Sequence, residues 1–164
     1  MHYRYHDSPV GRLLLVGDEA GLQQLLMEMD ERPWQIEEDW QSAGAELDAP
    51  CRQLDDYFAG RRRRFELPLA PRGTAFQLAV WQALQQIPFG QTRCYSGLAE
   101  AIGRPRAVRA VGAANGANPI AIIIPCHRVI GRDGSLTGYA GGLARKALLL
   151  QLEGVQSPQQ ALVF

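Results

Sequence analysis

Cys126 and His127 are neighbours in the chain and could act as a nucleophile and its base. A free thiol has a pKa near 8.5, so only about 3% of it is thiolate at pH 7 unless its surroundings help. His127 is the only histidine after residue 6, and an imidazole within reach of a thiol can remove its proton. The alternative is an inert buried cysteine beside a surface histidine. The adjacency is unlike cysteine proteases, whose cysteine and histidine are distant in sequence.

A base of this kind is usually oriented by a carboxylate. After residue 66 the chain has three acidic residues, Glu100, Asp133 and Glu153. Asp133 precedes a glycine in a predicted turn, where a structural role is sufficient. Glu153 ends the last predicted helix, where a negative charge is unfavourable to the helix dipole. An acid in that position indicates a partner, so we interpret Glu153 as the group that orients His127.

Lys146 is the only lysine of the chain, and the other 16 basic residues are arginines. It precedes Glu153 by seven residues, which places the two on the same face of a helix predicted over 143–153. A cation near Cys126 would favour its thiolate. The spacing by itself favours a solvated helix lysine.

The part of the chain that holds these residues has helical periodicity. A helix is predicted over 75–87, because Thr74 and Gln77 fit a capping box and apolar residues recur at helical spacing. Between residues 120 and 124 four isoleucines predict a buried strand, with Cys126 just beyond its end. A glycine-rich loop precedes the helix at 143–153, whose residues Leu148, Leu149 and Leu152 we expect to point inward. Residues 155–164 are predicted to form a loose tail.

Two short helices are predicted between these elements, from Tyr95 to Ile102 and over about 106–115. Gly103-Arg104-Pro105 separates them, with Pro105 at the first position of the second helix. This length and punctuation are typical of a helix-turn-helix. The second helix carries small residues that would let it approach a nucleic-acid backbone, although they would equally let it pack against protein.

The first part of the chain predicts a small antiparallel sheet. Strand-like runs at residues 3–5, 12–16 and 22–27 are separated by turn clusters. A helix at about 47–59 follows, and a further strand is predicted at residues 65–69. We divide the chain into an N-terminal lobe, residues 1–70, and a C-terminal lobe, residues 74–164.

The formal net charge of zero conceals an asymmetry. Residues 1–60 hold 13 acidic and 4 basic residues, and residues 61–164 hold 4 acidic and 13 basic residues, so the two parts carry −9 and +9. The second part, taken alone, has the charge of a nucleic-acid-binding protein. The run Arg61 to Arg64 is interpreted as a solvated hinge or a partner for the acidic lobe, with a DNA-backbone contact as the alternative.

Composition excludes several other classes of protein. No apolar run approaches the roughly 20 residues of a membrane span, and the first residues do not form a signal peptide, so we expect a cytoplasmic protein. The three cysteines, Cys51, Cys94 and Cys126, are too few and too widely spaced for a disulfide framework or a CxxC metal site.

Five motifs, taken in order, resemble the O6-alkylguanine-DNA alkyltransferase family in its bacterial stand-alone form. The resemblance covers residues 74–164 strongly and residues 1–70 more weakly, and Pro-Cys-His-Arg-Val is the acceptor motif of that family. The matching segments are Tyr95 with Arg109-Ala110-Val111-Gly112, Asn118-Pro119, Ile124-Pro125-Cys126-His127-Arg128-Val129, Gly138-Tyr139-Ala140-Gly141-Gly142-Leu143 and Glu153-Gly154.

The resemblance implies an α/β fold with a ribonuclease-H-like N-terminal lobe and a C-terminal lobe with a winged helix-turn-helix. It also implies a suicide methyltransferase that moves a methyl or alkyl group from O6 of guanine in duplex DNA onto its own cysteine, once per molecule. The DNA would be bound through the minor groove and the damaged nucleotide flipped into a pocket. O4-alkylthymine is a further expected substrate.

By the same matching, Cys126 would be the acceptor, His127 the base acting through a water, and Glu153 its orienting group. Asn118 would brace the motif loop, and Lys146 would assist activation. The remaining roles are a base pocket of Tyr95, Tyr139, the carbonyls of Cys126 and Val129 and the amide of Ala140, and a DNA contact made by Arg109, Tyr95, Ala107, Gly112 and Ala114. No cofactor is implied, and we expect a monomer that binds duplex DNA and no membrane.

Two departures from the family pattern affect these expectations. Cys94 stands where a serine usually precedes the tyrosine, so we expect a slightly weaker start to the following helix. The first lobe has only Cys51, His2 and His6 of the residue types that bind zinc in some members, so no metal is predicted. The competing interpretations are a non-repairing lesion sensor or helix-turn-helix regulator, and a cysteine hydrolase.

Overall fold

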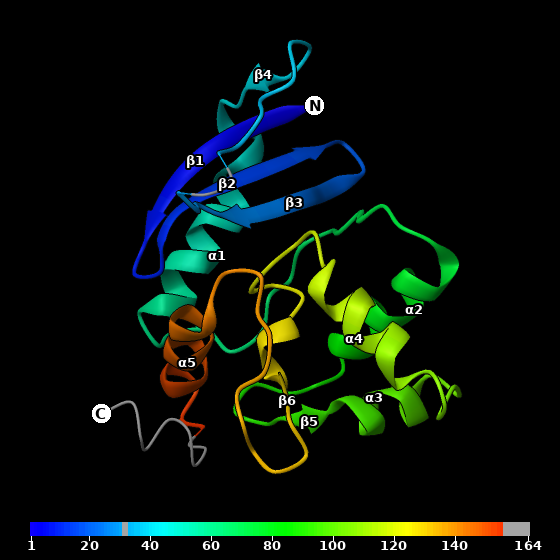
Figure 1. Ribbon diagram of the computed structural model, residues 1–164. Coiled ribbons are helices and arrows are strands. Elements are labelled where there is room, and N and C mark those ends of the chain that lie inside the picture. Colours follow the sequence, from blue (N-terminus) through cyan, green and yellow to red (C-terminus); the bar gives the residue numbers. More distant parts are fainter. Residues whose placement is uncertain (31–32, 156–164) are drawn as a thin grey trace. The chain divides into compact units, whose positions relative to one another are not determined.

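The computed structural model describes residues 1–30 and 33–155, which form two compact units (Figure 1). One unit contains Met1–Arg72 together with Pro119–Ala121, and the other contains Gly73–Asn118 and the chain from residue 122 onward. The mixed α/β architecture, with a sheet in the first unit and helices in the second, confirms the predicted fold class. The predicted tail lies outside the described residues except for Val155.

A four-stranded sheet forms the first unit, with strand order β3-β2-β1-β4. Its three long strands form an antiparallel meander, as predicted, but the short β4 pairs in parallel with β1. Four consecutive apolar residues in the middle of β2 are buried, which is why strict alternation is missing from its sequence. The strands are β1 (His2–Ser8), β2 (Gly11–Asp18), β3 (Gly21–Met27) and β4 (Gln41–Ser42).

Helix α1 (Asp48–Phe58), after a 3-10 turn η1 (Ala45–Leu47), confirms the helix predicted at 47–59. It buries one stripe that includes Cys51 and Leu54. The chain leaves this helix at Gly60, whose φ of +77° is readily adopted by glycine.

The strand predicted at 65–69 is wrong. Only Leu69 makes a bridge, in parallel with Leu22, and the preceding residues have no regular structure. Pro119–Ala121 pairs with the same strand, because the Leu25 amide donates to the Pro119 carbonyl at 2.8 Å and the Ala121 amide donates to the Leu25 carbonyl at 3.0 Å. Two short segments thus occupy hydrogen-bonding groups of β3 that would otherwise be an open edge.

The second unit contains four helices within the described residues. They are α2 (Ala75–Leu84), α3 (Tyr95–Ala101), α4 (Val108–Gly116) and α5 (Leu143–Leu152). Both halves of the predicted capping box at the start of α2 are present, since Gln77 N donates to Thr74 Oγ1 and Thr74 N donates to Gln77 Oε1. None of the helices in the described ranges has the length and hydrophobicity that a bilayer span requires.

Helices α3 and α4 form the predicted helix-turn-helix, but the second helix begins later than predicted. Pro105 is not its first residue: it lies in a turn closed by a bond of 2.9 Å from Ala107 N to Arg104 O. Proline is favoured at the second position of such a turn for the same reason as at a helix start, since its φ is fixed near −65°.

The predicted strand at residues 120–124 is also wrong. Residue 120 makes one bridge, and residues 121–124 form a turn in which Ile122 has a φ of +70°. Positive φ is costly for a β-branched residue, and all four isoleucines are buried. Apolar composition therefore predicted the burial of this segment correctly and its backbone incorrectly.

Candidate active site

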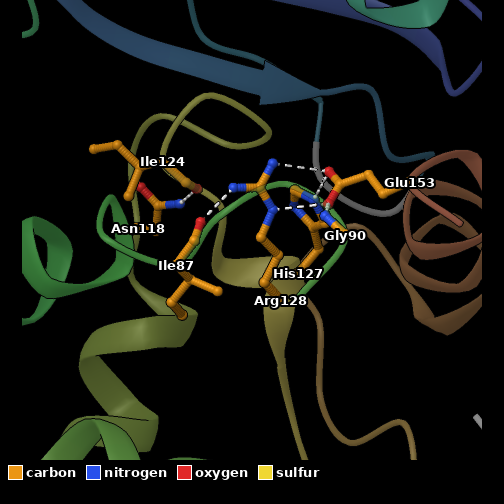
Figure 2. A network of polar contacts seen from close by, with 7 residues as sticks. All are labelled: Ile87, Gly90, Asn118, Ile124, His127, Arg128 and Glu153. Carbon is orange, nitrogen blue, oxygen red and sulfur yellow. Dashed lines mark hydrogen bonds and ion pairs between the residues drawn. The ribbon is translucent and has the colours of Figure 1, made fainter. Parts of the chain in front are cut away.

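Cys126 opens a 3-10 turn, η2 (Cys126–Arg128), rather than following a strand. Its residue is 7% exposed. Two buried or half-buried amides hold the turn. Asn115 Nδ2 donates to the Cys126 carbonyl at 3.4 Å. Asn118 Nδ2 donates to the Ile124 carbonyl at 2.7 Å (Figure 2). These two bonds restrain the backbone on both sides of Pro125.

A parallel ladder brings the start of α3 to the residues that follow Cys126. Strand β5 (Arg93–Cys94) pairs with β6 (Val129–Ile130), with Arg93 opposite Val129. Cys94 is the N-cap of α3, and its sulfur accepts a bond of 3.4 Å from the Gly97 amide. The cap position predicted from the sequence is correct, and a sulfur takes the place of the usual oxygen.

Burial raises the pKa of the Cys126 thiol, and the side chain of Asn118 and the charge of Lys146 only partly oppose this effect. At neutral pH the free protein therefore carries a thiol and needs a base to form the nucleophile.

His127 and Glu153 form a completely buried pair. His127 Nε2 and Glu153 Oε2 are 2.7 Å apart, and neither side chain is exposed (Figure 2). Burial lowers the pKa of His127, although the bond to Glu153 and the charge of that carboxylate act in the opposite direction. The imidazole is consequently neutral at pH 7 and can accept a proton.

Glu153 is the C-cap of α5, and the structure brings it to His127 as the misplaced acid predicted. Burial would raise the pKa of this carboxyl, but the bonds and charges of His127 and Arg128 together lower it to about 2. Asp133, the rejected candidate, accepts a bond from the Ser135 amide within its own turn.

Sequence reasoning missed two groups that contact the carboxylate. Arg128 donates through Nε to Glu153 Oε1 at 2.8 Å, and the Gly90 amide donates to the same oxygen at 3.3 Å. The sequence marked Gly90 only as part of Pro88-Phe89-Gly90, which was interpreted as the end of a helix and not as a contact with Glu153. Arg128 was visible only as part of the acceptor motif.

Lys146 is fully buried, which overturns the solvated position that its spacing favoured. Its Nζ donates to the carbonyls of Val129, at 2.7 Å, and Thr137, at 2.6 Å. Burial lowers its pKa to about 8, while the nearby Cys126 acts in the opposite direction. The lysine thus joins β6, which follows η2, to the loop that precedes α5.

The residues assigned to the base pocket occupy three segments of the second unit: the start of α3, the segment of Cys126 and Val129, and the loop before α5. Tyr95, at the start of α3, accepts a bond of 3.0 Å from Thr137 Oγ1 in the glycine-rich region. Tyr139 is half-buried, and its buried hydroxyl has no hydrogen-bond partner among the described residues. Val129 is fully buried, whereas Ala140 is exposed.

Of the residues assigned to DNA contact, Tyr95 begins α3, and the other four lie on α4 or at its N-cap. Arg109 is exposed, and Ala107 and Gly112 are half-buried. Ala114 is 3% exposed, and its carbonyl accepts a bond of 2.8 Å from the Trp81 indole. We therefore leave Ala114 out of the DNA-contacting set. Leu148 was likewise expected inside, but it is 39% exposed.

Comparison with known proteins places both units in one family. A model described as the DNA binding domain of 6-O-methylguanine DNA methyltransferase matches residues 75–155, and the model of its ribonuclease-like domain matches residues 1–71. A methylated-DNA–protein-cysteine methyltransferase from Methanosarcina acetivorans is 49% identical over 154 residues, which cover 94% of this chain and 99% of the relative. The Mycobacterium tuberculosis protein of that name is 47% identical and covers 100% of this chain and 99% of its own.

A solved structure agrees with these sequence matches. The crystal structure of Mycobacterium tuberculosis OGT in complex with DNA superposes with a TM-score of 0.87 at 47% identity, covering 100% of this chain and 99% of that chain. The methyltransferase from Pyrococcus kodakaraensis, at 24% identity and a TM-score of 0.67, supports the fold alone.

Proposed function

The chain belongs to the 6-O-methylguanine DNA methyltransferase family, and we propose that Cys126 is its alkyl acceptor. The protein is a methylated-DNA–protein-cysteine methyltransferase, and it repairs DNA by direct reversal of the damage. The observation that carries the assignment of the site is the buried pair of His127 and Glu153, 2.7 Å apart, directly after the buried Cys126 in the chain.

The reaction requires one bond to form and one to break. His127 takes the thiol proton, directly or through a water, and Cys126 Sγ attacks the alkyl carbon on O6 of guanine. The S–C bond forms as the C–O6 bond breaks, and the electron pair of that bond goes to the purine, which takes up a proton. The product is a thioether that nothing in the site can reverse, so each molecule acts once. Tyr95 supports the departing purine by donating towards its developing negative charge.

The lesion must leave the base stack before this attack, at a cost of a few kcal/mol. We assign Arg109, exposed on α4, to the gap that the flipped nucleotide leaves in the duplex. Ala107 and Gly112 allow α4 to approach the minor groove closely. Tyr139 and the amide of Ala140 line the base pocket. The carbonyls of Cys126 and Val129 are assigned to the exocyclic amine of guanine. The Cys126 carbonyl already accepts from Asn115 Nδ2 and from the Val129 amide, and the Val129 carbonyl accepts from Lys146 Nζ.

The substrate is duplex DNA with O6-alkylguanine, and we propose that the protein binds it as a monomer in the cytoplasm. Most of the affinity comes from phosphates, so it falls with salt and depends little on sequence. A second candidate, a sensor that binds the lesion without repair, is disfavoured because the acceptor cysteine is present.

Intact-mass analysis after incubation with O6-methylguanine duplex tests the proposal. The wild type should gain one methyl group per molecule, about 14 Da, and peptide mapping should place it on Cys126. The variants Cys94→Ala and Cys51→Ala should gain the same mass, whereas Cys126→Ala should gain none. Methylation of Cys126→Ala, or repeated turnover by the wild type, would contradict the assignment, and an unmodified wild type that binds the lesion would indicate a sensor.

A further inference from the structure

Arg128 clamps both oxygens of the Glu153 carboxylate. Its Nε donates to Oε1 at 2.8 Å and its Nη2 donates to Oε2 at 3.1 Å, in the planar fork that arginine forms with a carboxylate (Figure 2). The side chain of Arg128 is 8% exposed, and that of Glu153 is not exposed. A pair this deeply buried stabilises little in net terms, because desolvation offsets the attraction. Its contribution therefore lies in the geometry and charge that it imposes on Glu153.

The loop after α2 fixes the guanidinium from the other side. Arg128 Nη1 donates to the Ile87 carbonyl at 2.7 Å, and the guanidinium carbon lies 5.9 Å from the centre of the Phe89 ring. The same loop presents the Gly90 amide to Glu153 Oε1. Gly90 has a φ of +82°, which disfavours any side chain there. The loop thus positions two donors to the carboxylate.

Protonation of the pair decides whether His127 can act as a base. With Glu153 ionised, the imidazole donates through Nε2 and keeps its lone pair on Nδ1, a buried atom with no hydrogen-bond partner among the described residues. If the pair takes up a proton, it exists as imidazolium beside carboxylate, or as a Glu153 hydroxyl donating to Nε2. In both arrangements Nδ1 carries a hydrogen, and the base is lost.

We propose that Arg128 is a positioning residue for alkyl transfer: its two-pronged contact with Glu153, held by Ile87 and Phe89, keeps the carboxylate ionised and the lone pair of His127 on Nδ1. The inference rests on the proposed function, in which His127 deprotonates Cys126. It assigns to the arginine of the acceptor motif a task separate from the nucleophile and the base. The side chain of Arg128 donates to Glu153 and to the Ile87 carbonyl, so it acts on His127 through Glu153.

The sign of the expected pH effect follows from the charges that face the imidazole. They are the carboxylate of Glu153, the guanidinium of Arg128 and the ammonium of Lys146. The positive charge of Arg128 contributes to the lowered pKa of His127 and to that of Glu153. Removing it makes the pair bind a proton more readily, so the base is lost at a higher pH than in the wild type.

The test is the pH profile of transfer from a free O6-alkylguanine base, which separates the chemistry from DNA binding. We compare the wild type with Arg128→Gln, Arg128→Lys and the exposed control Arg72→Gln between pH 5 and 9. Transfer should fall on the acid side in every protein, and the fall should begin at higher pH in Arg128→Gln. Each unit of upward shift in the apparent pKa of the pair lowers the rate about tenfold on that limb.

The outcomes separate a positioning role from a structural one. Arg128→Lys, which keeps the charge but loses the fork, should restore the position of the acid limb without restoring the full rate. A rate that falls equally at every pH in Arg128→Gln, with the acid limb unchanged, would overturn the proposal. Transfer to a residue other than Cys126 in the wild type would instead overturn the proposed function.

Nitrogen-15 NMR of the wild type provides a test that needs no stable Arg128 variant. The chain has three histidines, and His2→Gln and His6→Gln identify the signals of His127. At pH 7 the imidazole should be neutral with its hydrogen on Nε2. A hydrogen on Nδ1, alone or in an imidazolium ion, would overturn the proposal even if both arginine variants failed to fold.

Discussion

The buried ammonium of Lys146 predicts an alkaline rise in stability that a lysine-free variant should lack. Burial lowers its pKa from 10.5 to about 8. Between these pH values the unfolded chain binds about one proton more than the folded protein, so the free energy of unfolding rises with pH. A shift of about 2.5 pKa units corresponds to a rise of about 3 kcal/mol, most of it between pH 8 and 10.5.

Urea unfolding of the wild type and Lys146→Met at pH 7, 8, 9 and 10 measures this rise. The wild type should gain stability relative to the variant as the pH increases. The raised pKa of Cys126 has the opposite effect in both proteins: the thiol ionises more readily in the unfolded chain, so the free energy of unfolding falls as the pH rises. Removing Lys146 raises that thiol pKa further, so the coupling enlarges the expected difference.

The change with pH, and not the difference at one pH, is the diagnostic quantity. At pH 7 the variant loses two hydrogen bonds to the carbonyls of Val129 and Thr137 but also avoids burying a charge. Arg52→Met, at an exposed residue of α1 that does not titrate in this range, serves as the control. A stability difference between the wild type and Lys146→Met that stays constant from pH 7 to 10 would refute the reasoning.

Three further predictions concern the surface and the thiols. Arg109→Ala should leave transfer from free O6-alkylguanine intact and slow transfer from duplex DNA. The rate should fall about tenfold for each 1.4 kcal/mol by which the variant raises the free energy of flipping the nucleotide. An equal loss of rate on both substrates would exclude a role in flipping. Replacing Arg61 to Arg64 by serine should change the slope of log affinity against log salt by less than about 0.9, which is the effect of one phosphate contact. The reason is that Arg61 and Arg62 already pair with Asp56. A larger change in the slope would indicate a DNA contact. Iodoacetamide at pH 7.5 should label Cys94 before Cys126 in the free protein. Hydrogen bonds from Ser96 and Gly97 lower the pKa of the Cys94 thiol, whereas burial raises the pKa of the Cys126 thiol. If peptide mapping found the reverse order, Cys126 would not be protonated in the free protein.

Sequence reasoning was most successful where one local rule determines the outcome. The capping box of Thr74 and Gln77, the helix start at Tyr95 and the three strands of the meander all follow from side-chain chemistry within a few residues. The position of Glu153 was predicted for a related reason, because an acid at a helix C-terminus is unfavourable unless tertiary structure supplies a partner. His127 and Arg128 supply it.

The errors arose where tertiary packing decides the conformation. The isoleucines at 120–124 are buried in a turn, and burial by itself does not distinguish a turn from a strand. Lys146 can be buried because the carbonyls of Val129 and Thr137 accept hydrogen bonds from its amine. Helical spacing contains no information about carbonyls elsewhere in the chain. Arg128 follows the same pattern: its partner Glu153 is 25 residues away, and the loop carbonyl that it contacts is 41 residues away.

These buried cations alter the meaning of the charge asymmetry. Residues 61–164 carry +9, but Arg128 and Lys146 are buried in the site, and Arg61 and Arg62 face Asp56. Four of the 13 basic residues in this part therefore already have partners within the protein. The groups available to attract phosphates are the exposed arginines of the second unit. Within the described residues these are Arg93, Arg104, Arg106, Arg109 and Arg132. Five contacts would give a salt slope of no more than about −4.5. A zero net charge is thus compatible with DNA binding, and the modest number of available arginines predicts weak binding to undamaged duplex, with the proposed base pocket adding affinity for a lesion.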